Sequence, residues 1–208
     1  MNLEVLVEEL SAEQALRILL PQIVGKEVMF EIRSFSGKTD LLKKLPQRLR
    51  GYATWVAAAD TRIVVLVDRD DDDCVALKAK LEKIAAEAGL STPSTASDAA
   101  DVIVVNRIAV EELEAWFFGD VTALHRAYPR VPATLNQQAR YRVPDTINGT
   151  WEALEHVLQK HGYHAAGLPK TVAAVEIAKH MDVERNRSQS FQAFRDGLRR
   201  LVGGGSDA

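Results

Sequence analysis

Residues 63–67 read Ile-Val-Val-Leu-Val, a run of five apolar residues of which four are β-branched. A continuous run of this kind is typical of a strand that is buried on both faces of a parallel sheet. The residues after it include Leu77, Leu81, Ile84 and Ala88, which recur at the spacing of one helix face. We therefore predict a central buried strand at 63–67 that is followed by a helix.

Three further short segments are rich in β-forming residues and are predicted to be strands: 3–7, 28–35 and 101–105. Each is followed by residues at helical spacing. Because four strands alternate with helices, we predict an α/β fold with a mainly parallel, four-stranded, Rossmann-like sheet flanked by helices, over residues 1–118.

The helix boundaries in this core follow from local signals. Ser11, with Gln14 three residues later, predicts a capping box at the start of the first helix. The second helix is expected to open at Thr39 and to be interrupted at Pro46. The helix after the fourth strand is predicted over 109–118.

The second half of the chain carries no comparable strand pattern. After a polar, proline-containing loop, three helices are predicted: 150–160, 169–181 and 188–201. We expect residues 119–202 to form a helical extension that packs on the core, and residues 203–208, Gly-Gly-Gly-Ser-Asp-Ala, to form a flexible tail.

Composition excludes several classes of protein. The 208 residues contain one cysteine, Cys74, which excludes a disulfide framework and every multi-cysteine zinc motif. No stretch reaches the roughly 18 apolar residues of a membrane span, and Glu4 and Glu8 lie where a signal peptide needs a basic start. We therefore expect a cytoplasmic protein without membrane contact. The net charge of −3 is too small to indicate a partner.

The densest local signal is Asp68-Arg69-Asp70-Asp71-Asp72-Asp73, directly after the buried strand. Ligands bind at this carboxyl end of the strands in open α/β sheets. Capping of the next helix explains Asp71 and Asp73. It does not explain Asp68, which lies at the end of the strand itself.

Two other acidic groups are expected at the same edge of the sheet. Glu8 and Glu9 close the first strand, and Glu111, Glu112 and Glu114 belong to the helix predicted after the fourth, with Glu114 turned inward. Oxygen ligands without cysteine favour Mg²⁺ or Mn²⁺, whose usual chemistry is phosphoryl transfer. The predicted metal ligands are Glu8, Asp68, Asp70, Asp72, Glu112 and Glu114.

Three basic residues are candidates for contact with phosphate. Lys38 lies in Gly-Lys-Thr between a strand and a helix, although Ile32 occupies the position where a Walker A motif needs glycine. Arg69 lies within the acidic run, and Lys170 begins a predicted helix. Lys38 and Arg69 are predicted to bind substrate, and Lys170 to stabilise a phosphate transition state.

Several motifs together resemble a bacterial family labelled a domain of unknown function, which in turn looks like a divergent Toprim (topoisomerase-primase) domain. The residues that carry the resemblance span nearly the whole chain: 7–9, 11–13, 19–21, 37–42, 67–74, 111–117, 186–188 and 190–191. The resemblance extends to the nuclease half of overcoming-lysogenization-defect proteins. It implies a Toprim-like fold, a nuclease activity and, as partner, an ABC-type ATPase in phage defence.

The resemblance also implies roles for single residues. The Toprim glutamate falls on Glu8 or Glu9, because Glu9 occupies the position where Toprim domains usually have glycine. The Asp-x-Asp pair falls on Asp68 and Asp70. Glu114 with Glu112 resembles the later acidic ligand, and Lys170 resembles the late lysine. The catalytic set is thus Glu8, Glu9, Asp68, Asp70, Glu114 and Lys170.

Three functions remain open on the sequence. The first is Mg²⁺- or Mn²⁺-dependent cleavage of a phosphodiester in DNA or RNA. The second is a phosphatase, since Asp68 and Asp70 also resemble the nucleophile strand of haloacid-dehalogenase-like enzymes. The third is a non-catalytic Toprim-like subunit that binds an ATPase or nucleic acid. The oligomeric state is not predicted.

Overall fold

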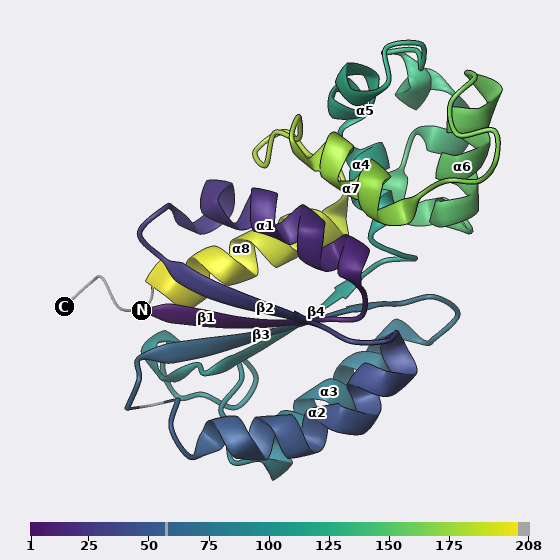
Figure 1. Cartoon of the computed structure of the whole chain (residues 1–208). Coiled ribbons are helices and arrows are strands. Elements are labelled where there is room, and N and C mark those ends of the chain that lie inside the picture. Colours follow the sequence, from purple (N-terminus) through teal and green to yellow (C-terminus); the bar gives the residue numbers. More distant parts are fainter. Residues whose placement is uncertain (57, 204–208) are drawn as a thin grey trace.

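The computed structural model describes residues 1–56 and 58–203 and shows an α/β fold built on one parallel sheet (Figure 1). Its four strands are β1 (Asn2–Val7), β2 (Met29–Ser34), β3 (Thr61–Asp68) and β4 (Val104–Ala109). The sheet order is β2-β1-β3-β4, with every neighbouring pair parallel. The predicted fold class is therefore confirmed, and 63–67 lies in one of the two central strands.

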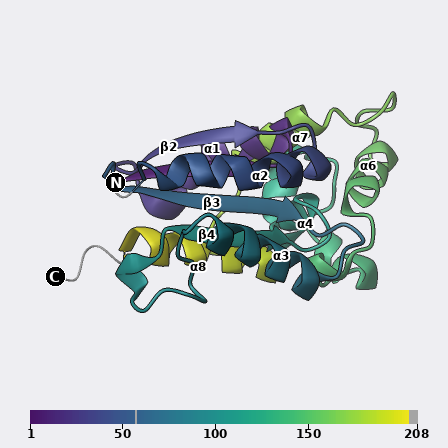
Figure 2. The ribbon, with the colours of Figure 1, turned by 90° about the horizontal axis from the view of Figure 1, so that it is seen from below.

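The helices divide between the two faces of the sheet and its carboxyl end. They are α1 (Leu10–Val24), α2 (Lys38–Ala53), α3 (Cys74–Glu87), α4 (Glu114–Gly119), α5 (Val121–Ala127), α6 (Thr150–Lys160), α7 (Lys170–Ala178) and α8 (Gln189–Gly203). Helices α2 and α3 cover one face, and α1 and α8 cover the other (Figure 1). Figure 2 shows α4, α6 and α7 beyond the carboxyl ends of the strands.

Strand residues alternate between two apolar cores. Val5 and Val64 contact the core under α1 and α8, whereas Leu6 and Val65 contact the core under α2 and α3. This alternation follows from the two-residue period of a strand. Both central strands bury both faces, which explains why residues 63–67 read as an uninterrupted apolar run.

Strand order places a topological switch point between β1 and β3. The chain leaves β1 through α1 toward β2 on one side, and leaves β3 through α3 toward β4 on the other. Helices that diverge in this way leave a crevice at the carboxyl ends of the two strands. The acidic run follows one of these strands, and Glu8 follows the other.

The fourth strand and the helix after it start later than predicted. Residues 101–103 of the predicted segment 101–105 are not in the strand, because Ala99–Asp101 form a 3₁₀ turn whose cap is the Asp98 side chain, which accepts from the Ala100 N–H at 3.1 Å. Pairing with β3 begins at Val104. The predicted helix 109–118 begins only at Glu114, since β4 continues through Ala109.

Two local signals in the first half were misread. The N-cap of α1 is Glu9, and Ser11 lies inside the helix, where its hydroxyl donates to Glu9 Oε1 at 2.6 Å. No capping box therefore forms between Ser11 and Gln14. Pro46 does not interrupt α2, which is continuous. Its apolar face is buried against the sheet through Leu41, Leu45 and Leu49, and this packing outweighs the loss of one helical hydrogen bond.

The later helices were predicted more closely. Helix α6 has the predicted bounds, α7 ends at Ala178 instead of residue 181, and α8 begins one residue later than predicted. Helix α5 lies in what the sequence suggested was a loop. Of the predicted tail, Gly203 ends α8, and 204–208 lie outside the described residues.

The helices after β4 contact the core through α7, which packs on α1, and α8, which packs on β4 and α1. Trp116 of α4 is fully buried against Phe191 and Phe194 of α8, with ring centroids 5.1 and 5.0 Å apart. Its indole N–H donates to Ser190 Oγ at 3.0 Å. One continuous apolar core therefore spans both halves of the chain.

A buried hydrogen-bonded junction joins the end of α4 to the start of α8. Asn186 is 1% exposed; its Nδ2 donates to the Trp116 carbonyl at 2.7 Å, and its Oδ1 accepts from the Ser188 N–H at 2.9 Å. Ser188 Oγ accepts from the Phe191 N–H at 3.1 Å and so caps α8. A serine hydroxyl that accepts from the backbone N–H three residues later is the usual N-cap contact of a helix. Gly119 passes directly beneath the Asn186 side chain.

Glu82 of α3 is the centre of a polar network beneath β4. Its carboxylate accepts from Asn106 Nδ2 at 2.9 Å and from Ser94 Oγ at 2.6 Å, and Lys78 Nζ lies 2.7 Å away. Burial opposes the charge of Glu82, but the hydrogen bonds from Asn106, Lys78 and Ser94 outweigh it and lower its pKa to about 2. The network therefore stabilises the fold only while Glu82 is ionised.

Acidification is expected to remove this contribution. It is complete above the ordinary glutamate pKa of 4.5 and is lost as the pH falls toward 2, because the folded chain then takes up a proton on Glu82. We expect Glu82→Gln to lower the free energy of unfolding by up to about 3 kcal/mol at pH 7 and by much less at pH 3. Urea denaturation at both pH values measures this difference. Glu87→Gln, on the exposed face of α3, is the control, and equal losses at both pH values would contradict the assignment.

Within the described residues, no helix has the length and apolar character needed to cross a membrane.

Candidate active site

The carboxyl ends of β1 and β3 bring Glu8 and Asp68 together at the switch point. Glu8 Oε1 accepts from the Asp68 N–H at 2.8 Å, a bond between residues 60 positions apart. Glu8 is 9% exposed, and Asp68 is partly exposed. Register fixes this pairing, since Val7, the last residue of β1, lies beside Leu66, two residues before the end of β3 at Asp68.

The surroundings of both carboxyl groups disfavour negative charge. Burial raises the pKa of Glu8 to about 7, although the Asp68 N–H and the Lys38 ammonium act in the opposite direction. Burial, and then the charges of Glu8 and Glu114, raise the pKa of Asp68 well above its ordinary value. Two acidic groups at one strand edge therefore need further positive charge to be ionised together.

Glu114, the first residue of α4, points into the protein as the sequence suggested. It is 2% exposed, and its Oε2 atom is buried without a hydrogen-bond partner among the described residues. Burial raises its pKa to about 7, partly offset by the Lys170 ammonium. A buried carboxylate oxygen without a partner is costly, and such groups in folded proteins usually have a ligand or a functional role.

Two lysines supply positive charge from opposite sides. Lys38, at the start of α2, donates to the Arg69 carbonyl at 2.8 Å and pairs with Asp70 and Asp72, each at 2.8 Å. Lys170, at the start of α7, lies 3.7 Å from Glu9 Oε1. Burial opposes the charge of Lys170, but Glu114 and Glu9 outweigh it and raise its pKa.

Asp70 lies at the tip of a strained turn. Its φ is 48°, in the left-handed region, and its N–H donates to the Glu111 carbonyl at 2.9 Å. Glu111, with φ of 58°, holds Arg69 in an ion pair. The loops after β3 and β4 are thereby fastened to each other, which orients the Asp70 carboxylate toward Lys38.

The remaining predicted residues serve other contacts. Glu112 accepts from Thr150 Oγ1 at 3.0 Å and from the Trp151 N–H at 2.7 Å, and so caps α6. Arg69 is engaged by Glu111. Asp73 caps α3 through the Ala76 N–H at 2.8 Å, as the sequence indicated. Asp72 is half-exposed, with its carboxylate on Lys38.

Sequence reasoning missed Trp151, which lines the site from α6. Lys170 Nζ lies 4.7 Å from the centroid of its ring, a cation–π contact that holds the ammonium near Glu9 and Glu114. No local pattern marks this tryptophan, because its contact depends on how α6 and α7 pack beyond the sheet.

A groove of about 340 Å³ adjoins this cluster between the first turns of α2 and α3. Lys38, Thr39, Asp72 and Lys80 line its polar part. Asp73 already caps the start of α3, but the start of α2 has no side-chain cap, so its free backbone N–H groups together with Lys38 and Lys80 favour an anion such as phosphate.

The side chains at this edge of the sheet have the type of ligand atom that a hard divalent cation such as Mg²⁺ prefers. Glu8, Asp68 and Glu114 offer carboxylate oxygens, one of them the partnerless Glu114 Oε2. Over residues 1–56 and 58–203, however, no three His, Cys, Asp or Glu side chains are arranged as metal ligands. Binding of Mg²⁺ or Mn²⁺ would therefore require these side chains to reorient.

Comparison with known proteins adds one match. A family described as a domain of unknown function (DUF4276) matches residues 7–199, from the end of β1 into α8. No curated protein and no solved structure matches the chain.

Proposed function

Because the chain belongs to the family described as a domain of unknown function (DUF4276), its function must be argued from the site, and we propose Mg²⁺- or Mn²⁺-dependent cleavage of a phosphodiester by a Toprim-like nuclease. The observation that carries the proposal is the buried, partnerless Glu114 oxygen beside Glu8 and Asp68 at the switch point. Folding brings these three acidic groups together against their own repulsion. A bound cation would relieve that repulsion.

In this proposal Glu8, Asp68 and Glu114 hold the cation. When bound, it supplies an activated water and stabilises charge on the phosphate oxygens. Lys38, at the border of the groove, neutralises a non-bridging phosphate oxygen, and Lys170 limits the repulsion between Glu9 and Glu114. Glu9, which is more exposed than Glu8, orients the attacking water. Asp70 and Asp72 keep Lys38 extended toward the groove.

Support for a Toprim-like activity comes from the agreement between two independent lines. The motif resemblance implies Glu8 or Glu9, the pair Asp68 and Asp70, Glu114 and a late lysine. The folded chain gathers the same residues at one strand edge, including Lys170, which is 102 positions from Asp68 in the sequence. The structure favours Glu8 over Glu9 as the buried glutamate.

Calorimetric titration with MnCl₂ and MgCl₂ is the first test. We expect wild type to bind at millimolar concentration or tighter, and Asp68→Asn to bind at least about tenfold more weakly, since it removes one ligand charge. Asp71→Asn is the matched control, because Asp71 is exposed and two residues from Asp73, the cap of α3. Equal affinity in all three proteins would contradict the metal site.

Cleavage is tested on labelled single- and double-stranded DNA and RNA with Mn²⁺. Asp68→Ala is expected to lower the rate at least about 100-fold, because it removes one of the three proposed cation ligands. Asp71→Ala, at an exposed position of the same loop, should retain the rate. Metal-dependent cleavage that survives in Asp68→Ala would exclude the proposed site.

A second candidate is a non-catalytic subunit that binds an ATPase or nucleic acid. It is favoured by the absence of a preformed metal-ligand set in the described chain and by the engagement of Glu8 with the Asp68 N–H. Under this candidate neither metal is bound, and an Asp68→Asn protein co-purifies with an ABC-type ATPase as well as wild type does. Metal binding that is lost in Asp68→Asn would favour the nuclease over the non-catalytic subunit.

A further inference from the structure

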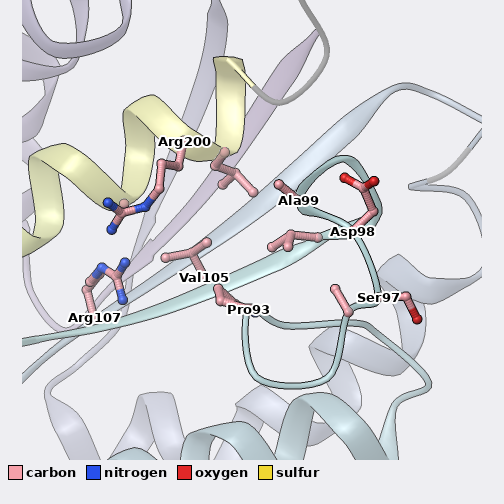
Figure 3. Close-up of a pocket in the computed structure, with 11 residues that line it drawn as sticks. Pro93, Ser97, Asp98, Ala99, Val105, Arg107 and Arg200 are labelled. Carbon is pink, nitrogen blue, oxygen red and sulfur yellow. The ribbon is translucent and has the colours of Figure 1, made fainter. Parts of the chain in front are cut away.

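A second cavity lies along β4, away from the acidic cluster. It has a volume of about 270 Å³ and opens between α8 and the loop that precedes β4 (Figure 3). Its walls include Val105 and Arg107 of β4, Arg200 and Leu201 of α8, and Pro93 of the loop. It shares no lining residue with the candidate active site or with the groove beside it.

Two arginines face each other at one end of this cavity (Figure 3). Arg107 Nε donates to the Ala193 carbonyl at 2.9 Å, and its Nη1 donates to the Asn106 carbonyl at 3.2 Å. Among the described residues, neither Arg107 nor Arg200 pairs with a carboxylate. Burial, and then the charge of Arg200, lower the pKa of Arg107, and the carboxylates of Glu82 and Asp196 offset this only in part. The two arginines therefore repel each other and would gain from an anion between them.

Gly197 makes room for this arrangement. A Cβ atom at this position of α8 would overlap the Arg107 guanidinium, since it would lie 2.7 Å from Cζ and closer still to two of the nitrogens. The helix therefore passes close over Arg107 and directs its guanidinium toward Arg200. Among the described residues, Asp98 is the only acidic residue in the lining; it lies at the opposite end of the cavity and caps a 3₁₀ turn (Figure 3).

Apart from Ser97, the rest of the lining is apolar. Pro93, Ala96, Val102, Val105 and Leu201 form a continuous wall beside the arginines. A cavity of this size is at the small end of ligand sites and admits a body of about one ring. The phosphate backbone of a nucleic-acid strand would make no favourable contact with the apolar wall. An inorganic anion would bind the arginines but leave the apolar wall exposed to water.

We infer that this cavity binds a small organic anion, whose phosphate or carboxylate group lies between Arg107 and Arg200 and whose apolar body packs against Val102, Val105 and Leu201. The two anionic groups share one chemistry here, because arginine binds both through paired N–H donors. The inference does not depend on the proposed nuclease activity.

Phenyl phosphate and benzoate are suitable probes, with inorganic phosphate and benzyl alcohol as partial ligands. In titrations followed by NMR, we expect wild type to bind phenyl phosphate or benzoate, and the preferred one identifies the anionic group. Each partial ligand should bind at least about tenfold more weakly, since inorganic phosphate lacks the apolar ring and benzyl alcohol lacks the anionic group. Arg200→Gln should weaken the preferred probe at least about tenfold.

Arg200 carries the test because it is exposed, whereas Arg107 tethers α8 and its loss would disturb packing. Arg50→Gln removes the same charge from the exposed face of α2 and should leave affinity unchanged. Ala99→Phe, at an exposed position of the lining, should block the cavity and abolish binding. The inference is overturned if wild type binds neither probe at 10 mM, if Arg200→Gln matches Arg50→Gln, or if inorganic phosphate binds as tightly as phenyl phosphate.

Discussion

Gly119→Ala is expected to lower the free energy of unfolding by about 3 kcal/mol, the largest loss we predict for a single methyl group. The added Cβ would overlap the Asn186 side-chain oxygen and lie 2.9 Å from the backbone nitrogen of Ser188. Both atoms are buried and already paired with each other, so neither can withdraw without losing a hydrogen bond. The start of α8 would separate from the end of α4.

Chemical denaturation of Gly119→Ala and Gly51→Ala measures this effect against a matched control. Gly51 lies inside α2 with nothing within 4 Å of its would-be Cβ, so alanine there should stabilise the chain by up to about 1 kcal/mol. Opposite signs for the two substitutions are the expected result. A decrease of less than about 1 kcal/mol in the free energy of unfolding of Gly119→Ala would contradict this prediction. It would mean that the contact between α4 and the start of α8 rearranges at little cost.

Glu114→Met is expected to raise the free energy of unfolding of the metal-free protein by about 2 kcal/mol at pH 8. Methionine has a similar volume and removes a buried carboxylate whose Oε2 has no hydrogen-bond partner in residues 1–56 and 58–203. Because burial raises the pKa of Glu114 to about 7, the side chain is ionised at pH 8 and is then least compatible with its surroundings. Lys170 keeps a carboxylate neighbour in Glu9.

Denaturation with and without Mn²⁺ separates stability from function. Wild type should gain stability with added Mn²⁺, whereas Glu114→Met should not, since only the native site binds the ion. Glu87→Met, on the exposed surface of α3, should change the metal-free stability by less than about 0.5 kcal/mol. Destabilisation by Glu114→Met without metal would mean that the carboxylate is a structural group.

The sheet could be predicted because its strands are buried on both faces. Residues 63–67 show this directly, since a strand that is buried on both faces is a short, uninterrupted run of apolar residues, and few other elements have this sequence pattern. The start of β4 could not be predicted, because residues 102 and 104 are both valine and the strand begins where β3 offers a partner. The continuity of α2 through Pro46 likewise depends on packing against the sheet.

The location of the candidate site was also accessible from the sequence. Glu8 and Asp68 lie at the carboxyl ends of parallel strands. These ends lie at one edge of the sheet, independent of the conformation of the loops that follow. The contacts of Glu111 and Glu112 could not be predicted from the sequence. Glu111 forms its ion pair with Arg69 from a tight loop, and Glu112 caps the start of α6, which is distant in the sequence. The predicted helix over 109–118 assigned these two residues to the wrong element.

Helix α8 completes one face of the sheet from the far end of the chain. Arg199 of α8 donates to the Ile23 carbonyl at the end of α1, a bond between residues 176 positions apart. During synthesis, the apolar surface of β4 under α8 therefore stays uncovered until residues 189–203 have left the ribosome. The opposite face, covered by α2 and α3, needs only the first 109 residues to form. The nascent chain thus passes through a stage with one finished face and one exposed apolar face, when it is most open to aggregation and to chaperones.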